Sequence, residues 1–154
     1  MNYKNITVAG SGVLGSQIAY QTAFKGFQVT VYDINDEALE RAKERISQLK
    51  PHYQADLGAT QEEVEAAYGR MSFSSDLPQA VADADLVIEA IPEVVSIKTD
   101  FYASLGKAAP EKTIFATNSS TCCQANLLKL RAVRRNFWRC ISPTRFGKTI
   151  RRKS

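Results

Sequence analysis

A glycine pattern near the start of the chain constrains the fold more than any other sequence feature. It is formed by Gly10, Gly12 and Gly15, with the spacing G-x-G-x-x-G. It directly follows the apolar run Ile6–Ala9 and opens the helix-like stretch Val13–Phe24. In such a strand–turn–helix unit, the first glycine permits the tight turn, the second lets the backbone approach a pyrophosphate, and the third allows close packing of helix on strand. The pattern therefore predicts a dinucleotide-binding site.

An acidic residue after the next apolar run supports this interpretation. Asp33 directly follows Gln28–Tyr32. A carboxylate at the end of this second strand can accept hydrogen bonds from an adenosine ribose and would repel a 2′-phosphate, so we expect NAD rather than NADP. The backbone N–H groups of Val13, Leu14 and Gly15, at the start of the helix, are the expected donors to the phosphates. The alternative is a glycine-rich turn with a surface Asp.

The order of apolar runs and amphipathic stretches indicates an α/β fold. Strand-like and helix-like segments alternate along the chain, which is typical of a Rossmann-type, doubly wound parallel sheet with ligands at the carboxyl ends of its strands. Pro51 is expected to end the second helix. The expected strands are Ile6–Ala9, Gln28–Tyr32, Met71–Ser74, Leu86–Ala90 and Thr113–Thr117, and the expected helices are Val13–Phe24, Glu37–Leu49, Gln61–Tyr68, Leu77–Val81 and Ser96–Ala108.

Charge divides the chain into two unlike parts. Residues 1–121 carry 10 basic and 16 acidic side chains, whereas residues 122–154 carry 10 basic and no acidic ones. No run approaches the roughly 18 apolar residues of a membrane span, and we expect a cytoplasmic protein. No metal site is expected, because Cys122 and Cys123 are adjacent rather than spaced as CxxC, and Cys140 has no histidine near it.

Two further stretches name a family. They are Ala84–Glu93, with Lys98 after it, and Ala116–Thr121. Together with the glycine pattern and Asp33, they resemble the NAD-binding domain of the L-3-hydroxyacyl-CoA dehydrogenases over residues 3–121. The resemblance implies an NAD-dependent oxidoreductase of fatty-acid metabolism that interconverts 3-hydroxyacyl-CoA and 3-oxoacyl-CoA. It also implies a separate helical domain that dimerises and helps to hold the acyl-CoA.

The resemblance assigns roles to three residues. Glu93 and Lys98 match family positions that contact NAD, and Ser120 matches a serine placed near the nicotinamide and the substrate oxygen. Read without the family, Glu93 and Lys98 would be an exposed charge pair five residues apart, which contributes little. Ser120 alone could be a helix cap.

The resemblance stops at Thr121. The family continues with a Gly-Arg-Pro-Glu-(Lys/Arg)-Phe turn and a catalytic histidine in the context His-Phe-x-Asn, neither of which occurs here. The only histidine, His52, is expected at the surface, after a charged helix. Codons allowed for residues 121–154 give the missing family text, histidine included, when one T is restored after the Thr121 codon. We therefore interpret residues 122–154 as an out-of-frame basic tail.

This interpretation has consequences for activity. Without the catalytic histidine and the helical domain, we expect a truncated protein reduced to its NAD-binding domain and without useful dehydrogenase turnover. The sheet is expected to lack its sixth strand, because that strand would lie in the altered segment. The alternative is an NAD-binding module whose natural basic tail binds nucleic acid or other acidic partners.

Overall fold

The computed structural model describes residues 2–118 and the backbone of residues 137–140. Its centre is a parallel sheet of six strands in the order β3-β2-β1-β4-β5-β6. This order confirms the expected Rossmann-type, doubly wound α/β fold. The strands are β1 (Asn5–Ala9), β2 (Gln28–Tyr32), β3 (Met71–Ser74), β4 (Leu86–Glu89), β5 (Ile114–Thr117) and β6 (Phe137–Cys140).

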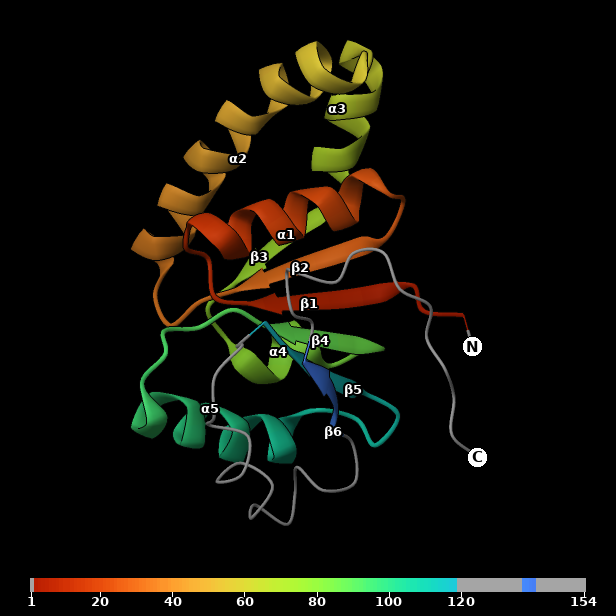
Figure 1. Ribbon diagram of the computed structural model, residues 1–154. Helices are drawn as coiled ribbons and strands as arrows, with labels where there is room; N and C mark the ends of the chain where they lie inside the picture. The colour runs from red at the N-terminus through yellow and green to blue at the C-terminus, as the bar shows by residue number, and fades with distance from the viewer. Residues whose placement is uncertain (1, 119–136, 141–154) are drawn as a thin grey trace.

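Helices cover both faces of this sheet (Figure 1). Three of them lie on one side, and the other two lie on the opposite side beneath β1, β4 and β5. Each lies within about two residues of an expected helix at its N-terminal end, and four of the five do so at both ends. The first group is α1 (Val13–Phe24), α2 (Asp36–Leu57) and α3 (Gln61–Gly69), and the second is α4 (Leu77–Val81) and α5 (Val95–Ala108).

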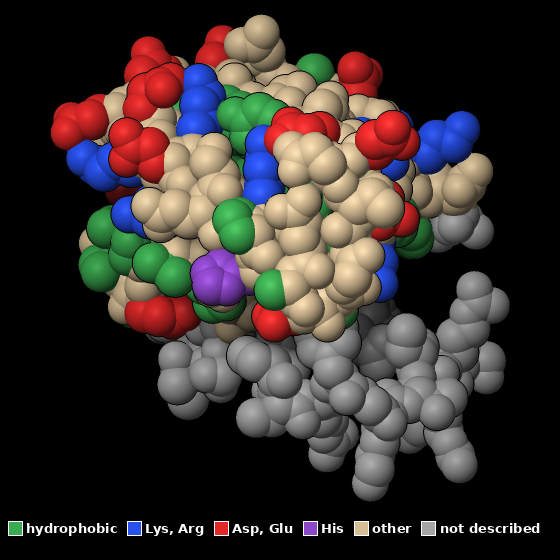
Figure 2. All heavy atoms as spheres, turned by 90° about the horizontal axis from the view of Figure 1, so that it is seen from above, with side chains coloured by type: hydrophobic (Ala, Val, Ile, Leu, Met, Phe, Trp, Pro, Cys, Tyr) green, Lys and Arg blue, Asp and Glu red, His purple; other side chains and the backbone are tan. Residues whose placement is uncertain are grey.

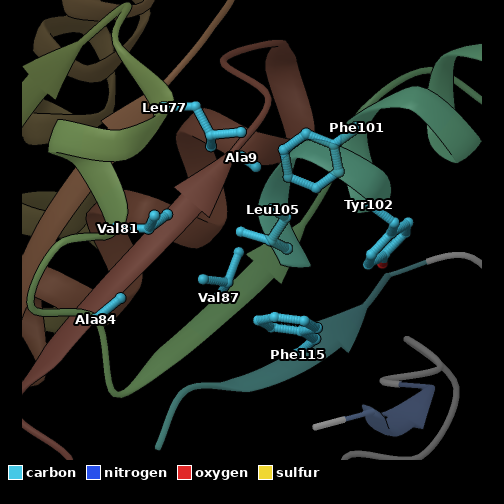
Figure 3. Packing of buried hydrophobic residues seen from close by; sticks show 9 residues of the cluster. All are labelled: Ala9, Leu77, Val81, Ala84, Val87, Phe101, Tyr102, Leu105 and Phe115. Atoms are coloured by element: carbon cyan, nitrogen blue, oxygen red, sulfur yellow. The ribbon is translucent and has the colours of Figure 1, made fainter. Parts of the chain in front are cut away.

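Alternate residues of each strand face opposite helix layers, so side chains of the sheet pack in two separate hydrophobic cores. In β4, Ile88 packs with the α1 layer, whereas Val87 packs with the α4–α5 layer. Figure 3 shows the second core, in which Phe101, Tyr102 and Leu105 of α5 lie over Val87 and Phe115. Burial on both faces explains why the strands read as continuous apolar runs.

The register brings the strand ends to one level. Ala9 pairs with Tyr32 of β2 on one side and with Glu89 of β4 on the other. After β1 the chain winds outward to β2 and β3, and then crosses back to β4 on the other side of β1. The strand order therefore reverses between β1 and β4, which is where such sheets bind their ligands.

The second helix differs from the expected one. Pro51 does not end it, because α2 runs on to Leu57 and ends at Gly58, which has a φ of 64°. The residues after Pro51 are held by tertiary contacts, since the ring of Tyr53 packs edge-on against Tyr20 at 4.7 Å between ring centroids. The apolar spacing around Pro51 contained no sign of this contact.

The sixth strand was also predicted wrongly. β6 pairs in parallel with β5, with Phe115 opposite Phe137 and Thr117 opposite Cys140, and its register shifts between these two pairs. The unpaired edge of β5 offers backbone donors and acceptors, and aromatic residues favour strands. A short aromatic segment can therefore pair there whatever its family resemblance.

The described part of the surface places the only histidine of the sequence. His52 is exposed, and histidine is visible on the face shown in Figure 2, where acidic and basic side chains are interspersed. Among the described helices, none is both long and apolar enough to cross a membrane. Residues 2–118 contain no group of three side chains arranged to hold a metal ion.

Candidate functional site

A cleft of about 1120 Å³ opens at the carboxyl ends of the central strands. Its walls are the glycine loop Gly10–Gly15, the ends of β2 and β4, and residues from α2, α4 and α5. The volume is at the upper limit for small-molecule sites and suits a ligand as large as a dinucleotide. The cleft thus lies at the topological switch point of the sheet.

The glycine loop can exist only with glycine at two of its positions. Gly10 has a φ of 103°, and a Cβ built on it would overlap the carbonyl group of Ala90, which directly follows β4. A Cβ on Gly15 would overlap the carbonyl of Gly10. At Gly12, by contrast, an added Cβ would meet nothing within 4 Å. The open space beside Gly12 is where a ligand can approach the backbone.

The start of α1 is open toward this cleft. Gly12 is the N-cap residue, and no side chain of residues 2–118 caps the helix. The next two residues, Val13 and Leu14, line the cleft and are 64% and 47% exposed. The first-turn N–H groups of a helix have no partner within the helix. Together with the helix dipole, they favour a phosphate at this position.

Asp33 lies directly beside the loop, as expected. Its Oδ2 accepts hydrogen bonds from the backbone nitrogen of Ser11 at 2.9 Å and from the Ser11 hydroxyl at 2.5 Å. Its Oδ1 accepts one from the backbone nitrogen of Ile34 at 2.7 Å. The carboxylate lines the cleft at the end of β2. It is therefore held where an adenosine ribose would lie in a fold of this kind.

Two arginines and a tyrosine line the half of the cleft that contains Asp33. Arg41 and Arg45 of α2 line it, and Arg45 Nη1 donates to the carbonyl of Ser11 at 3.1 Å. Burial, followed by the nearby carboxylates of Asp33 and Asp76, raises the pKa of Tyr32 above its ordinary value. Tyr32 is therefore neutral at physiological pH and lines the cleft as an aromatic wall.

The other half of the cleft, at the end of β4, is bordered by a buried cluster of charged side chains. Glu89 and Lys98 are each 1% exposed, and their carboxylate and ammonium lie 3.3 Å apart. The same ammonium lies 3.0 Å from Oε1 of Glu93, whose side chain is 51% exposed at the rim. Glu89 and Glu93 line the cleft. The interpretation of Glu93 and Lys98 as an exposed pair is therefore wrong for Lys98.

Glu89 accepts three more hydrogen bonds. Thr117 of β5 donates its hydroxyl at 2.6 Å and Tyr102 of α5 donates at 3.2 Å, both to Oε2. The backbone nitrogen of Ile91 donates to Oε1 at 2.9 Å. The cluster therefore ties together β4, β5, α5 and the loop after β4, which is what a buried carboxylate requires.

Several functional residues were not found from the sequence. Glu89 stood inside an apolar strand, and an acidic residue in such a run is a sign of a buried partner. Ser11 was read only as the variable position between two glycines. Asn118, which donates its backbone N–H to the Glu89 carbonyl at 3.0 Å, also lines the cleft. Ser120 lies outside the described residues, and so do Cys122 and Cys123.

These features fit a dinucleotide. A loop that excludes side chains, an uncapped helix start and a carboxylate at the end of the neighbouring strand are the three elements that hold a pyrophosphate and its ribose. When bound, an NAD molecule supplies a hydride acceptor at its nicotinamide ring. Of the residues that line the cleft, Gly10, Gly12, Val13, Leu14 and Gly15 would hold the pyrophosphate and Asp33 the adenosine ribose, with Glu93 at the opposite rim.

Comparison with known proteins identifies the same ligand class. Residues 5–139 match the family model described as 3-hydroxyacyl-CoA dehydrogenase, NAD binding domain. The match runs past Thr121, into the segment that we interpret as out of frame. A probable 3-hydroxybutyryl-CoA dehydrogenase of Bacillus subtilis is 39% identical over 79% of this chain and 42% of its own length. The human mitochondrial hydroxyacyl-coenzyme A dehydrogenase is 34% identical over 77% of this chain and 39% of its own length.

Solved structures agree with the sequence matches. The structure of a diketoreductase with substrate-directed dual catalysis of dicarbonyl compounds has a TM-score of 0.84 and 51% identity, and the match covers 89% of this chain and 49% of that one. The Escherichia coli 3-hydroxybutyryl-CoA dehydrogenase has a TM-score of 0.73 and 36% identity over 79% and 26% of the two chains. The chain spans about two fifths of the length of its curated relatives. It belongs to the 3-hydroxyacyl-CoA dehydrogenase family, through the NAD-binding domain of that family.

Proposed function

We propose that this chain binds NAD(H) in the cleft as the cofactor-binding part of a 3-hydroxyacyl-CoA dehydrogenase. The observation that carries the proposal is the position of Asp33, whose carboxylate is held against the glycine loop by both the N–H and the hydroxyl of Ser11. A fixed carboxylate there accepts ribose hydroxyls and repels a 2′-phosphate. The proposed contacts are the glycine loop, Asp33, Glu93 and Lys98, with Ser120 beyond the described residues. Lys98 is buried behind the cleft lining and would act next to Glu93, from which its ammonium lies 3.0 Å.

Binding is tested with the purified chain. Titration followed by NADH fluorescence is expected to saturate in the micromolar to low millimolar range, with NADPH at least about tenfold weaker because of charge repulsion at Asp33. Gly12→Val, which places a branched side chain on the cleft side of the glycine loop, is the negative control. No saturation by millimolar NADH in a folded sample would remove the proposal.

Substrate chemistry is a separate part of the proposal. We propose a 3-hydroxyacyl or 3-oxoacyl thioester as the substrate of the complete enzyme, because the curated relatives carry this name. The 51% identity to the diketoreductase favours a second candidate, a small dicarbonyl compound. Saturation-transfer NMR distinguishes the two candidates. Acetoacetyl-CoA and a dicarbonyl ester are added to the same sample with NADH, and the signals of the compound that binds lose intensity.

Turnover is not expected from this stretch of chain. Oxidation of a secondary alcohol needs a base for the hydroxyl proton while the hydride leaves. The family's His-Phe-x-Asn context is absent from these 154 residues, and His52 is exposed in α2, outside the cleft lining. We expect the purified chain to show no NADH production from 3-hydroxybutyryl-CoA, and measurable production would contradict this.

The basic segment 122–154 gives the proposal a genetic test. We infer that it is out-of-frame translation, on the ground that its composition breaks abruptly and that one restored base yields family text. Sequencing the coding DNA decides the question, because an intact reading frame without a lost base contradicts the inference. In that case the alternative predicts salt-sensitive RNA or DNA binding that disappears when residues 122–154 are removed.

A further inference from the structure

Ser11, between the first two glycines, is not a passive spacer. Its side chain is 2% exposed, although the loop that carries it borders an open cleft. Its hydroxyl lies 2.5 Å from Asp33 Oδ2 and 3.3 Å from the carbonyl of Ala38. A hydroxyl has one proton to donate. The shorter, charge-assisted hydrogen bond to the carboxylate takes that proton.

Ser11 also has its own position fixed. Its carbonyl accepts hydrogen bonds from the Ser16 hydroxyl at 3.1 Å and from Arg45 Nη1 at 3.1 Å. These two donors come from α1 and α2, on either side of the loop. The backbone of Ser11, which carries the hydroxyl that donates to Asp33, is therefore held by side chains from two helices.

The result is an asymmetric carboxylate. Each carboxylate oxygen accepts about two hydrogen bonds. Oδ2 of Asp33 has both from Ser11, whereas Oδ1 has one from Ile34 among the described residues. The oxygen that retains capacity for a ribose hydroxyl is therefore Oδ1. Ser11 fixes the rotation of the carboxylate that puts this oxygen in place.

The same rotation decides against a phosphorylated ribose. Arg41 and Arg45 line this end of the cleft and are the cations that a 2′-phosphate would seek. A carboxylate held by two donors from Ser11 cannot turn aside to uncover them. Without the hydroxyl, the carboxylate keeps only the backbone N–H groups of Ser11 and Ile34 among its described donors, so it turns more easily and the penalty against a 2′-phosphate falls.

We propose that Ser11 is a positioning residue that sets the preference for NAD(H) over NADP(H) by holding Asp33 through its hydroxyl. This rests on the proposed cofactor binding. The step beyond that function is that a side chain in the glycine loop, and not Asp33 alone, determines which of the two cofactors the cleft accepts.

The test compares affinities for NADH and NADPH by fluorescence titration. Ser11→Ala is expected to weaken NADH about fivefold, the effect of losing part of one hydrogen bond to a charged group, and to leave NADPH unchanged or slightly tighter. Ser11→Cys keeps the size of the side chain and is expected to behave like Ser11→Ala if the latter folds poorly. The control is Thr22→Ala, which removes a half-buried hydroxyl of α1 that donates to the Ile18 carbonyl at 2.7 Å and lies outside the cleft lining, and it is expected to leave both affinities unchanged.

A double-mutant cycle shows whether Ser11 acts through Asp33. In an Asp33→Ala background, Ser11→Ala is expected to change neither affinity. The proposal is overturned if Ser11→Ala leaves the NADH to NADPH ratio at its wild-type value, if it tightens NADH, or if its effect persists without Asp33. A wild-type chain that binds no NADH refutes the proposed function itself and this inference with it, so the two failures are distinguishable.

Discussion

The two halves of the cleft hold a carboxylate in opposite ways. Asp33 is half-buried, and all its described partners are backbone N–H groups and a hydroxyl from its own loop region. Glu89 is 1% exposed and pairs with a buried ammonium, two hydroxyls and one backbone nitrogen. Both lie at the ends of strands that flank β1. The same chemical group, a carboxylate at the carboxyl ends of the strands, thus meets two different environments.

This difference separates binding from folding. A half-buried carboxylate with an oxygen that accepts one hydrogen bond among the described residues, as Oδ1 of Asp33 does, can accept another from a ligand at modest free-energy cost. A fully buried carboxylate and ammonium cannot, because each would be left as an uncompensated charge. We therefore expect substitutions around Asp33 to change cofactor affinity and substitutions around Glu89 to change stability.

The largest expected effect is on the buried cluster. Lys98→Met removes the ammonium that lies 3.3 Å from Glu89, and the free energy of unfolding is expected to fall by about 3–5 kcal/mol, as for other broken buried pairs. Urea denaturation measures it. The matched control, Lys112→Met, removes an ammonium that is bonded to Asp85 but 57% exposed, and a much smaller loss is expected. Equal losses would contradict the claim that burial makes the Glu89 cluster important for stability.

Two glycines of one loop separate folding from binding within the adenosine half. Gly10→Ala combines a positive φ with overlap of the Ala90 carbonyl, so it is expected to cost about 2 kcal/mol or more in unfolding free energy. Gly12→Ala has free space and a φ of −65°, so stability is expected to change by less than about 1 kcal/mol.

The same pair is then titrated with NADH. Gly12→Ala is expected to weaken binding about tenfold or more, because its methyl group occupies the space through which a pyrophosphate approaches the backbone. A stable Gly12→Ala variant with unchanged affinity would show that the ligand does not pass along this loop.

A smaller effect is expected at the helix caps. Asn35 caps α2, two residues after Asp33, by accepting from the Ala38 nitrogen at 2.8 Å. Asn35→Ala is expected to lower the free energy of unfolding by about 1 kcal/mol and to weaken NADH slightly. Thr60→Ala, at the capping box of α3, is expected to cost a similar amount of stability without any change in affinity. Equal changes in NADH affinity in both variants would mean that the cap acts through global stability alone.

The smallest effect is expected at the opposite edge of the sheet. Hydrogen bonds from the backbone nitrogens of Asn5 and Lys4, and then from the Lys112 ammonium, hold the pKa of Asp85 well below its ordinary value. A carboxylate with a lowered pKa stabilises the folded state above its unfolded-state pKa of about 3.9, and this contribution is lost as pH falls further.

Asp85→Asn is therefore expected to lower the Tm at pH 7 and to flatten its decline below about pH 4, with NADH affinity unchanged. Thermal melts from about pH 2 to about pH 7, a range that spans the ordinary pKa of Asp, measure this pH dependence. A variant with the wild-type pH profile would show that Asp85 makes no difference to folding.

Much of the fold was predictable, because its signals are local. Strands β1–β5 were predicted to within a residue or two, since burial on both faces requires continuous apolar runs of strand length. The end of α2 was not predicted, because the contact of Tyr53 with Tyr20 joins residues 33 positions apart. β6 was not expected either, since pairing along the free edge of β5 depends on backbone groups and not on a family motif.

The features of the candidate site also fall into those set by local sequence and those set by tertiary contacts. The sequence by itself determined the turn at Gly10–Gly15 and the place of Asp33, because glycine at φ 103° and a fixed spacing between strand ends are properties of the chain in one βαβ unit. Only the tertiary structure decided that Ser11 would hold that carboxylate. It alone also brought Lys98, Tyr102 and Thr117 onto Glu89, because these side chains meet only after α5 and β5 have packed against β4.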